Sequence, residues 1–210
     1  MKKNELFSIF IAIIIMSFAS SFLYVITGNF SLVPEIIIFS VILVCVPIIG
    51  KKITAYTLDC NVEHEVWGVY FFGLKPKQHF KKEIPFGIIL PIVLSIFTLG
   101  TFKLLTLLTY ETRALKHRAA KRFGYYSYTE MTDWHNALIG ATGVISLYLL
   151  VIVSYVVGFE YLTKLAIYYS LFSLIPISKL DGTQIFFGSR IIWVVLSFIS
   201  FLMTMYALVL

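Results

Sequence analysis

The amino-acid sequence predicts an all-α polytopic membrane bundle of about six apolar segments, with a small β element near residues 53–72. Of the 210 residues, 59% are hydrophobic and 13% are charged. Water-soluble domains carry about 45–50% apolar and about 25% charged residues. Apolar runs also recur along the chain, and about 20 such residues cross a bilayer. We therefore predict an integral multi-pass protein, most simply of the cell membrane.

The net charge of +6 does not require a nucleic-acid partner, because the cytoplasmic loops of membrane proteins are rich in Lys and Arg. The expected partner is the lipid bilayer, and no nucleic acid is expected. Cys45 lies within an apolar run and Cys60 in a polar stretch. The two cysteines are therefore not expected to form a disulfide, and they do not report the redox compartment.

Residues 1–50 are predicted to form two N-terminal membrane spans. Lys51 and Lys52 follow the second span and are expected to end it. Ser17-Phe18-Ala19 resembles a cleavage site after a short apolar core, so a signal peptide is an alternative for the first span. The predicted spans are Leu6–Ile26 and Glu35–Ile49, joined by a turn at Gly28–Pro34.

Residues 51–84 are predicted to form a basic interfacial loop with short strands. The runs Ile53–Leu58 and Val66–Phe72 are rich in β-branched and aromatic residues, which favour strands. Four lysines follow, and they suit either anionic headgroups or a solvated stop-transfer loop. They are Lys75, Lys77, Lys81 and Lys82.

Residues 85–210 are predicted to form the membrane core. Pro85–Tyr110 is apolar with Pro91 and Gly100 inside it, and Glu111–Arg122 is expected to continue as a helix that leaves the membrane. Asp133 is a candidate N-cap for the span that follows. The later spans are expected at Ala137–Val157, Tyr161–Ile177 and Ile191–Leu210.

The distribution of basic residues bears on whether Pro85–Tyr110 crosses the membrane. If every segment crosses, nine basic residues lie on one side and seven on the other. If this segment dips in and returns, fifteen lie on one side and only Lys164 on the other. Because positive residues accumulate on the cytoplasmic side, the count favours a re-entrant segment. Such irregular backbone is tolerated where protein or water covers it.

The run Leu174–Gly182 resembles the Leu-Pro-x-x-x-Leu-Asp-Gly segment of site-2 proteases, a family of intramembrane zinc metalloproteases. Two weaker blocks, Ala119–Gly124 and Ala137–Gly143, are similar to the Ala-x-x-Phe-Gly tail of the family's HExxH helix and to the start of its next core helix. The resemblance covers about residues 93–190. It implies that Asp181 is the third zinc ligand and that its motif is Pro176, Leu180, Asp181 and Gly182.

The catalytic half of the family pattern is missing. Counting back from Phe123-Gly124, the HExxH positions fall on Thr112–Lys116, which contain no His and no Glu. HExxH requires two His on one helix face and a Glu that activates the zinc-bound water. A near match at His64-Glu65 lacks the second His and lies in strand-like sequence. The ligands and the catalytic base implied by the family are therefore absent from the expected place.

Several interpretations of the polar residues remain open. Glu130 and His135 could rebuild a metal site with Asp181, since zinc takes three protein ligands in catalytic sites. Alternatively, His135 lies among the headgroups, and Asp181 belongs to a structural turn or pairs with Lys179 or Arg190. A second basic cluster, expected to face headgroups, consists of Arg118, Lys121 and Arg122.

Three functions follow from these observations. The first is a non-catalytic relative of site-2 proteases, a pseudoprotease that binds or holds transmembrane segments of other proteins. The second is an active but divergent intramembrane zinc metalloprotease. The third is a small lipid or solute transport protein. No cofactor is expected for the first function, and zinc is the cofactor of the second.

Overall fold

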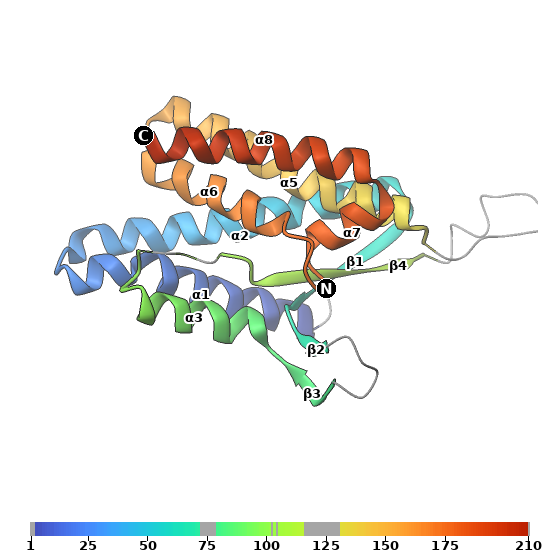
Figure 1. Ribbon diagram of the computed structural model, residues 1–210, viewed down its shortest axis with the longest axis horizontal. Helices are drawn as coiled ribbons and strands as arrows, with labels where there is room; N and C mark the ends of the chain where they lie inside the picture. Colours follow the sequence, from blue (N-terminus) through green and yellow to red (C-terminus); the bar gives the residue numbers. More distant parts are fainter. Residues whose placement is uncertain (1–2, 72–78, 102, 104, 116–130, 210) are drawn as a thin grey trace, which may run out of the picture.

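The computed structural model describes residues 3–71, 79–101, 103, 105–115 and 131–209. These residues form an elongated, mostly helical bundle (Figure 1). The helices are α1 (Lys3–Ile26), η1 (Phe30–Leu32), α2 (Val33–Thr57), α3 (Phe86–Phe97), α5 (Asp133–Val157), α6 (Glu160–Ser173), α7 (Asp181–Gly188) and α8 (Arg190–Val209). The strands are β1 (Cys60–Val66), β2 (Val69–Phe71), β3 (His79–Ile84) and β4 (Leu108–Ala114).

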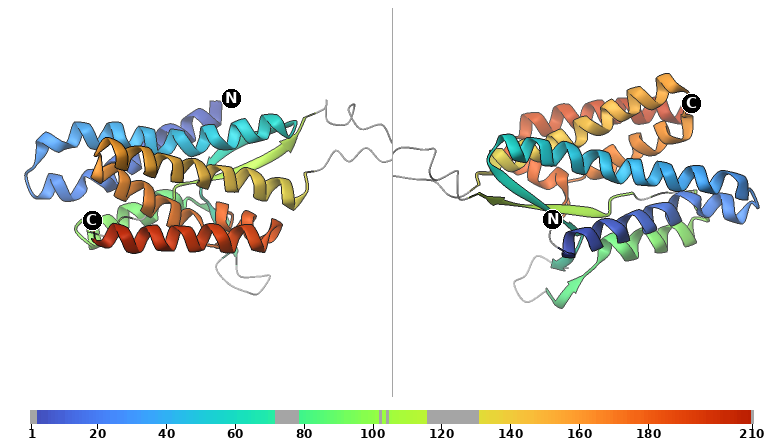
Figure 2. Two further views of the ribbon diagram at one scale, coloured as in Figure 1. Left: turned by 90° about the horizontal axis from the view of Figure 1, so that it is seen from above. Right: turned by 180° about the vertical axis from the view of Figure 1, so that it is seen from behind.

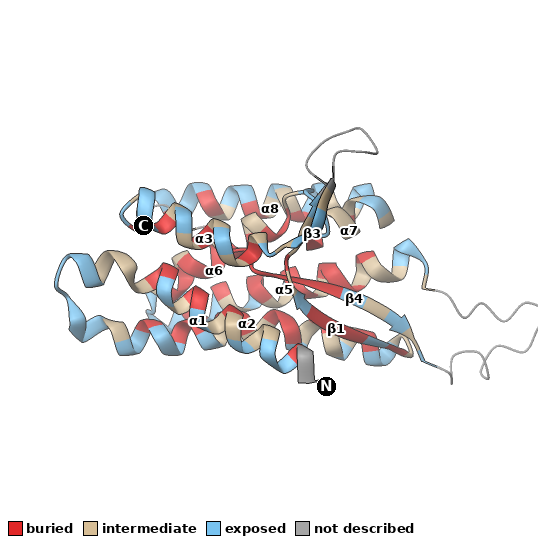
Figure 3. Ribbon diagram, turned by 90° about the horizontal axis from the view of Figure 1, so that it is seen from below, coloured by how far each residue is buried: buried red, intermediate tan, exposed pale blue. Residues whose placement is uncertain are grey.

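Four of the described helices, α1, α2, α5 and α8, are long and apolar enough to cross a membrane. Their buried residues face the centre of the bundle and exposed residues line the outside (Figure 3). Many of the exposed residues are large and apolar. An apolar exterior of this kind suits a lipid solvent. The two other predicted spans correspond to α3, with 12 residues, and α6, with 14 residues. Both are shorter than the roughly 20 residues that cross a bilayer.

Helix α2 extends further than the sequence suggested. It continues through Lys51 and Lys52 to Thr57, so the strand predicted at Ile53–Leu58 is wrong. Strand propensity depends strongly on packing context, and here the continued helix buries Lys51 and Ala55. Lys51 and Lys52 therefore lie within the helix and do not end it.

Two strands, β1 and β2, lie within the predicted range of residues 53–72, and two more, β3 and β4, follow later in the chain. β1 pairs with β4 in antiparallel register, with His64 opposite Tyr110, and β2 pairs with β3. The helix predicted over Glu111–Arg122 is therefore wrong for residues 111–114. Thr109, Tyr110 and Thr112 favour strands, and β1 supplies the hydrogen bonds that a strand needs. Residues 116–130, which include most of that prediction, lie outside the described part.

The described residues between 85 and 114 reverse their direction along the bundle. Helix α3 is followed by a reversal at Leu99 and Gly100, which have positive φ angles of 53° and 76°. A Cβ at Gly100 would lie 2.7 Å from the backbone nitrogen of Leu23, near the end of α1. The chain then returns in extended form through β4 (Figure 1). It therefore runs towards one end of the bundle and comes back.

Helix α2 lies between the two halves of the bundle (Figure 2). It packs on α1 and β1 on one side and on α5 on the other. Helices α6 and α7 pack on α5, and α8 packs on both of them. The start of α5 differs slightly from prediction, because Thr132 occupies the N-cap position and Asp133 is the first helical residue.

Candidate functional site

Asp181 forms a buried ion pair with Lys51. The Lys51 Nζ lies 2.5 Å from Asp181 Oδ2, and the two side chains are 5% and 9% exposed. This contact joins the C-terminal part of α2 to the first residue of α7, 130 positions later in the chain. Charged groups at membrane depth are rare and pair with one another, so this pair is the principal candidate site.

The motif around Asp181 places its carboxylate at the first turn of α7. Leu180 is buried at the N-cap position, and Asp181 is the first helical residue. Gly182 allows α7 to approach the end of α6 closely, because a Cβ there would collide with the backbone oxygen of Leu174. Pro176 is exposed in the intervening loop. The motif is therefore a tight connection that holds one carboxylate inside the protein.

The ammonium of Lys51 also lies over an aromatic ring. Its Nζ is 4.6 Å from the ring centroid of Tyr110, a distance typical of a cation–π interaction. The Tyr110 hydroxyl donates a hydrogen bond to the Asn136 carbonyl at 2.7 Å. Two glycines of α5 provide the space, because a Cβ at Gly143 would lie 2.5 Å from Lys51 Cε and one at Gly140 would lie 2.6 Å from the Tyr110 hydroxyl.

The charges of this site are sensitive to desolvation. Burial raises the pKa of the Asp181 carboxyl above its usual value, and the Lys51 ammonium opposes that shift. Burial and the Asp181 charge raise the pKa of Tyr110 well above its usual value, so Tyr110 remains a phenol that donates. Asp181 Oδ1 is buried and has no hydrogen-bond partner among the described residues. The carboxylate therefore depends mainly on Lys51 for stabilisation.

The neighbouring lysine, Lys52, makes an ion pair on the other side of α2. Its Nζ lies 2.6 Å from Glu5 Oε1, and His64 Nδ1 lies 3.3 Å from the same oxygen. Burial lowers the pKa of His64 to about 3, with Lys51 adding to the shift, so the imidazole is neutral at pH 7. Consecutive helical residues point about 100° apart. The two lysines therefore connect α2 to both halves of the bundle.

The structure does not bring the proposed metal ligands together. Helix α7 runs antiparallel to α5, with Gly188 against Asp133 and the Lys51–Asp181 pair at the level of Gly143. His135 is eight residues from Gly143, which corresponds to about 12 Å along a helix. Zinc–ligand distances are about 2.0–2.2 Å. His135 contacts Thr132 instead, and Glu130 lies outside the described residues.

The predicted partners of Asp181 also bind elsewhere. Lys179 Nζ lies 3.2 Å from Glu83 on β3, and the guanidinium of Arg190 lies 5.7 Å from the Phe186 ring centroid. The predicted headgroup cluster of Arg118, Lys121 and Arg122 lies outside the described part of the chain. Within that part, no group of three or more His, Cys, Asp or Glu side chains is placed to hold a metal ion. Among the described residues, no disulfide joins Cys45 and Cys60, which lie in α2 and at the start of β1.

Sequence reasoning missed Lys51, Glu5 and His64 as members of buried charge clusters. A usable signal was present, because an acidic residue at membrane depth needs a cation at the same depth. Lys51 was predicted to end a membrane span, and a residue in that place would lie in water. The pattern could not show that α2 continues for six residues beyond it.

The Lys51–Asp181 site can hold charge in a fixed place. Its carboxylate binds a cation, which here is the Lys51 ammonium. Comparison with known proteins gives no match: no family model, no curated protein and no solved structure matches the chain. The resemblance to site-2 proteases therefore remains a resemblance of three short blocks. The class of protein that the fold supports is a membrane protein with a buried electrostatic centre.

Proposed function

We propose that this protein is a non-catalytic membrane protein, related to site-2 proteases, that binds a transmembrane segment of another protein. The observation that carries the non-catalytic half of the proposal is the Lys51–Asp181 pair. The resemblance assigns Asp181 to zinc, but its carboxylate holds an ammonium at 2.5 Å. A fixed positive charge at this position disfavours a divalent cation.

The strand β4 supports the same interpretation. The positions that the family uses for its metal-binding helix include Thr112 and Arg113, and both lie in β4. Side chains at positions i and i+4 lie about 5–6 Å apart on a helix but about 13 Å apart on a strand. The strand conformation of Thr112 and Arg113 therefore does not provide the helical spacing that HExxH needs.

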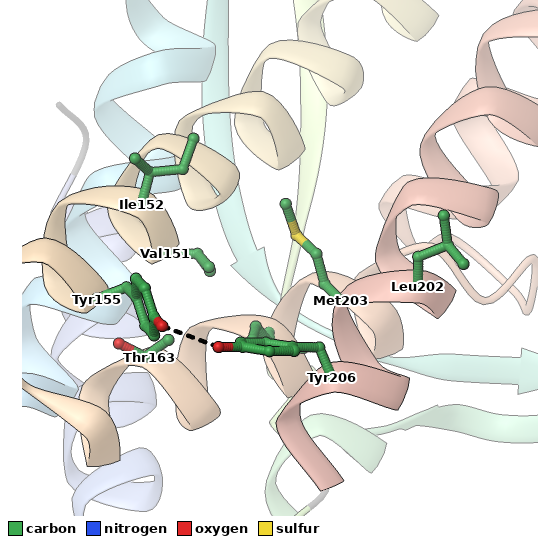
Figure 4. A pocket seen from close by; sticks show the side chains of 8 residues that line it. Val151, Ile152, Tyr155, Thr163, Leu202, Met203 and Tyr206 are labelled. Carbon is green, nitrogen blue, oxygen red and sulfur yellow. Dashed lines mark hydrogen bonds between the residues drawn. The ribbon is translucent and has the colours of Figure 1, made fainter. Parts of the chain in front are cut away.

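A groove between α5 and α8 is the surface that we assign to the partner (Figure 4). The cavity has a volume of about 350 Å³, and the hydroxyls of Tyr155 and Tyr206 are 2.8 Å apart beside it. Ile152 and Leu202 are 55% and 52% exposed. Its other lining residues are Val151, Thr163, Ile167 and Met203.

An apolar helix is the partner that this groove suits. Transmembrane helices associate through van der Waals packing and hydrogen bonds between polar side chains. The groove supplies an apolar channel and two hydroxyls that can each accept a further hydrogen bond. Helix α8 also has little cover from the other described residues, since many of its large apolar side chains are exposed.

The first test is metal content. We expect less than one zinc per chain in protein purified without added metal, measured by plasma mass spectrometry. Stoichiometric zinc that is lost in Asp181→Ala and retained in Lys179→Ala would overturn the non-catalytic assignment and favour the active metalloprotease.

The second test is photo-crosslinking in native membranes. A photoreactive amino acid at Ile152 or Leu202 should give a discrete adduct with a membrane-spanning protein. The matched controls are Val153 and Phe201, which are exposed and point about 100° away from their neighbours. Equal adducts at all four positions, or adducts with lipid alone, would contradict partner binding in this groove.

A further inference from the structure

A second cavity lies on the opposite side of α8 from the groove described above. It has a volume of about 500 Å³ and is bounded by the chain reversal after α3, by α6 and by α8. Ligand pockets commonly have volumes of about 300–1,000 Å³. Its lining combines two lysines, Lys103 and Lys164, with apolar side chains. The apolar residues are Leu165, Leu171, Phe172 and Leu208.

Lys103 is the unusual member of this lining. Its Nζ donates a hydrogen bond to the Tyr161 hydroxyl at 2.8 Å and lies 4.6 Å from the centroid of that ring. Tyr161 in turn donates to the Ser20 carbonyl at 2.7 Å. These contacts hold the ammonium in place, but all of them are with uncharged groups.

No acidic side chain within the described residues forms an ion pair with Lys103 or Lys164. The Lys51 and Lys52 ammoniums, in contrast, each have a carboxylate partner. Burial lowers the pKa of Lys103 to about 8. An anion in the cavity would offset that desolvation by favouring the protonated form.

The position of the cavity in the fold indicates which anion is available. Lys164 is near the start of α6 and Leu208 near the end of α8, so the cavity lies at the end of the bundle that holds the α1–α2 turn and the C-terminus (Figure 1). The ends of membrane-spanning helices lie near the headgroup layer. Lys side chains there extend towards that layer, while the apolar walls can accept an acyl chain.

We propose that this cavity binds one anionic phospholipid, with its phosphodiester between Lys103 and Lys164 and an acyl chain along α6 and α8. The two lysines account for a negative headgroup. The leucines and Phe172 account for an acyl chain, which a free phosphate ion would leave unused. The site is at the opposite end of the chain's long helices from the Lys51–Asp181 pair, and it does not depend on partner binding between α5 and α8.

The test uses the full chain purified in an uncharged detergent and titrated with lipid, with native mass spectrometry as the readout. Dioleoyl phosphatidylglycerol and dioleoyl phosphatidylcholine have the same acyl chains and differ in net charge, so they isolate the headgroup. We expect the anionic lipid to bind at least about tenfold more tightly, since each lysine near a phosphate contributes about fivefold in affinity. Glycerol phosphate and oleate, tested separately, distinguish a headgroup-only site and a fatty-acid site from a phospholipid site.

Lys103→Gln and Lys164→Gln should each weaken phosphatidylglycerol binding about fivefold and leave phosphatidylcholine binding unchanged. Lys179→Gln, an exposed lysine at the other end of the bundle, is the matched control and should bind as the parent does. Leu171→Trp, which fills the cavity without a change in charge, should weaken binding of both lipids and serves if Lys103→Gln fails to fold. Equal affinity for the two phospholipids, no effect of either lysine substitution, or equally tight binding of glycerol phosphate or oleate would overturn the proposal.

Discussion

The resemblance to site-2 proteases implies that Asp181 is a zinc ligand, whereas in the structure Asp181 forms an ion pair with Lys51. The sequence makes Asp181 distinctive because its charge is costly between two apolar runs, and the structure buries it in the protein interior. Its partner is 130 positions away. A buried pair of this kind tolerates the loss of both partners better than the loss of one, because a single deletion leaves an unpaired charge in a medium of low polarity.

We therefore expect Lys51→Ala and Asp181→Ala each to destabilise the protein by about 3–5 kcal/mol. The double variant Lys51→Met with Asp181→Leu should be close to the parent in stability, because both charges are removed and the volume is retained. The measurement is the free energy of unfolding in detergent by denaturant titration. Strict additivity of the Lys51→Ala and Asp181→Ala effects in the double-alanine variant would contradict a direct pair.

The double variant also separates structure from function. If the pair only stabilises the bundle, the double variant should retain crosslinking from Ile152 and Leu202. If it folds but loses those adducts, the charge centre has a role in partner binding.

Among the helices and loops, the connection from α6 to α7 is the most constrained. Leu180 is buried and Asp181 is paired, while a Cβ at Gly182 would collide with the backbone of Leu174. The sequence showed that this segment was distinctive through its Pro, Asp and Gly residues. The sequence did not show that Gly182 is needed for the close packing of α7 on the end of α6 and not for binding a ligand.

Gly182→Ala should destabilise the protein by about 1–3 kcal/mol, the range for overpacking a close contact. Alanine in an otherwise unobstructed helix position would instead stabilise it by about 0.5–1 kcal/mol, so the sign of the change is informative. Melting temperature in detergent is the measurement.

Gly68→Ala is the matched control for this substitution. A Cβ at Gly68 would meet the flexible side chain of Glu83, with the nearest atom at 3.3 Å, so we expect a small effect. A higher melting temperature for Gly182→Ala than for the parent would show that the contact with Leu174 is not tight.

For the molecule as a whole, the structure gives a topology that can be tested. The chain reversals at Gly28 and Gly158 lie at one end of the bundle, and β3 and the α6–α7 loop lie away from it (Figures 1 and 2). Basic residues of the described part gather away from the first end, apart from Lys103 and Lys164. This distribution follows the positive-inside rule if α3 and the extended return form one re-entrant unit and if α6, although short, brings the chain back across the membrane.

We expect single cysteines at Asn29 and Phe159 to be labelled from outside the cell by a membrane-impermeant maleimide. Cysteines at Lys81 and Lys179 should be labelled only after the membrane is permeabilised. The native Cys45 and Cys60 are first replaced by alanine. Labelling of Lys81 and Lys179 from opposite sides would show that residues 85–114 cross the membrane once, and would overturn the re-entrant topology.

The sequence by itself determined the class of protein, because apolar runs long enough for a bilayer require burial in lipid or protein wherever the chain goes. It also located the distinctive segment at Leu174–Gly182, since ionisable groups and glycines in such runs are costly without a reason. Only the tertiary structure decided that β4 is a strand and that α2 continues past Lys51. Both outcomes depend on partners far away in sequence: β1 provides the hydrogen bonds of β4, and Asp181 and Glu5 stabilise the two lysines. Local propensity contains no information about such distant contacts, so the segment around Asp181 could be recognised as distinctive, but its partner could not be predicted.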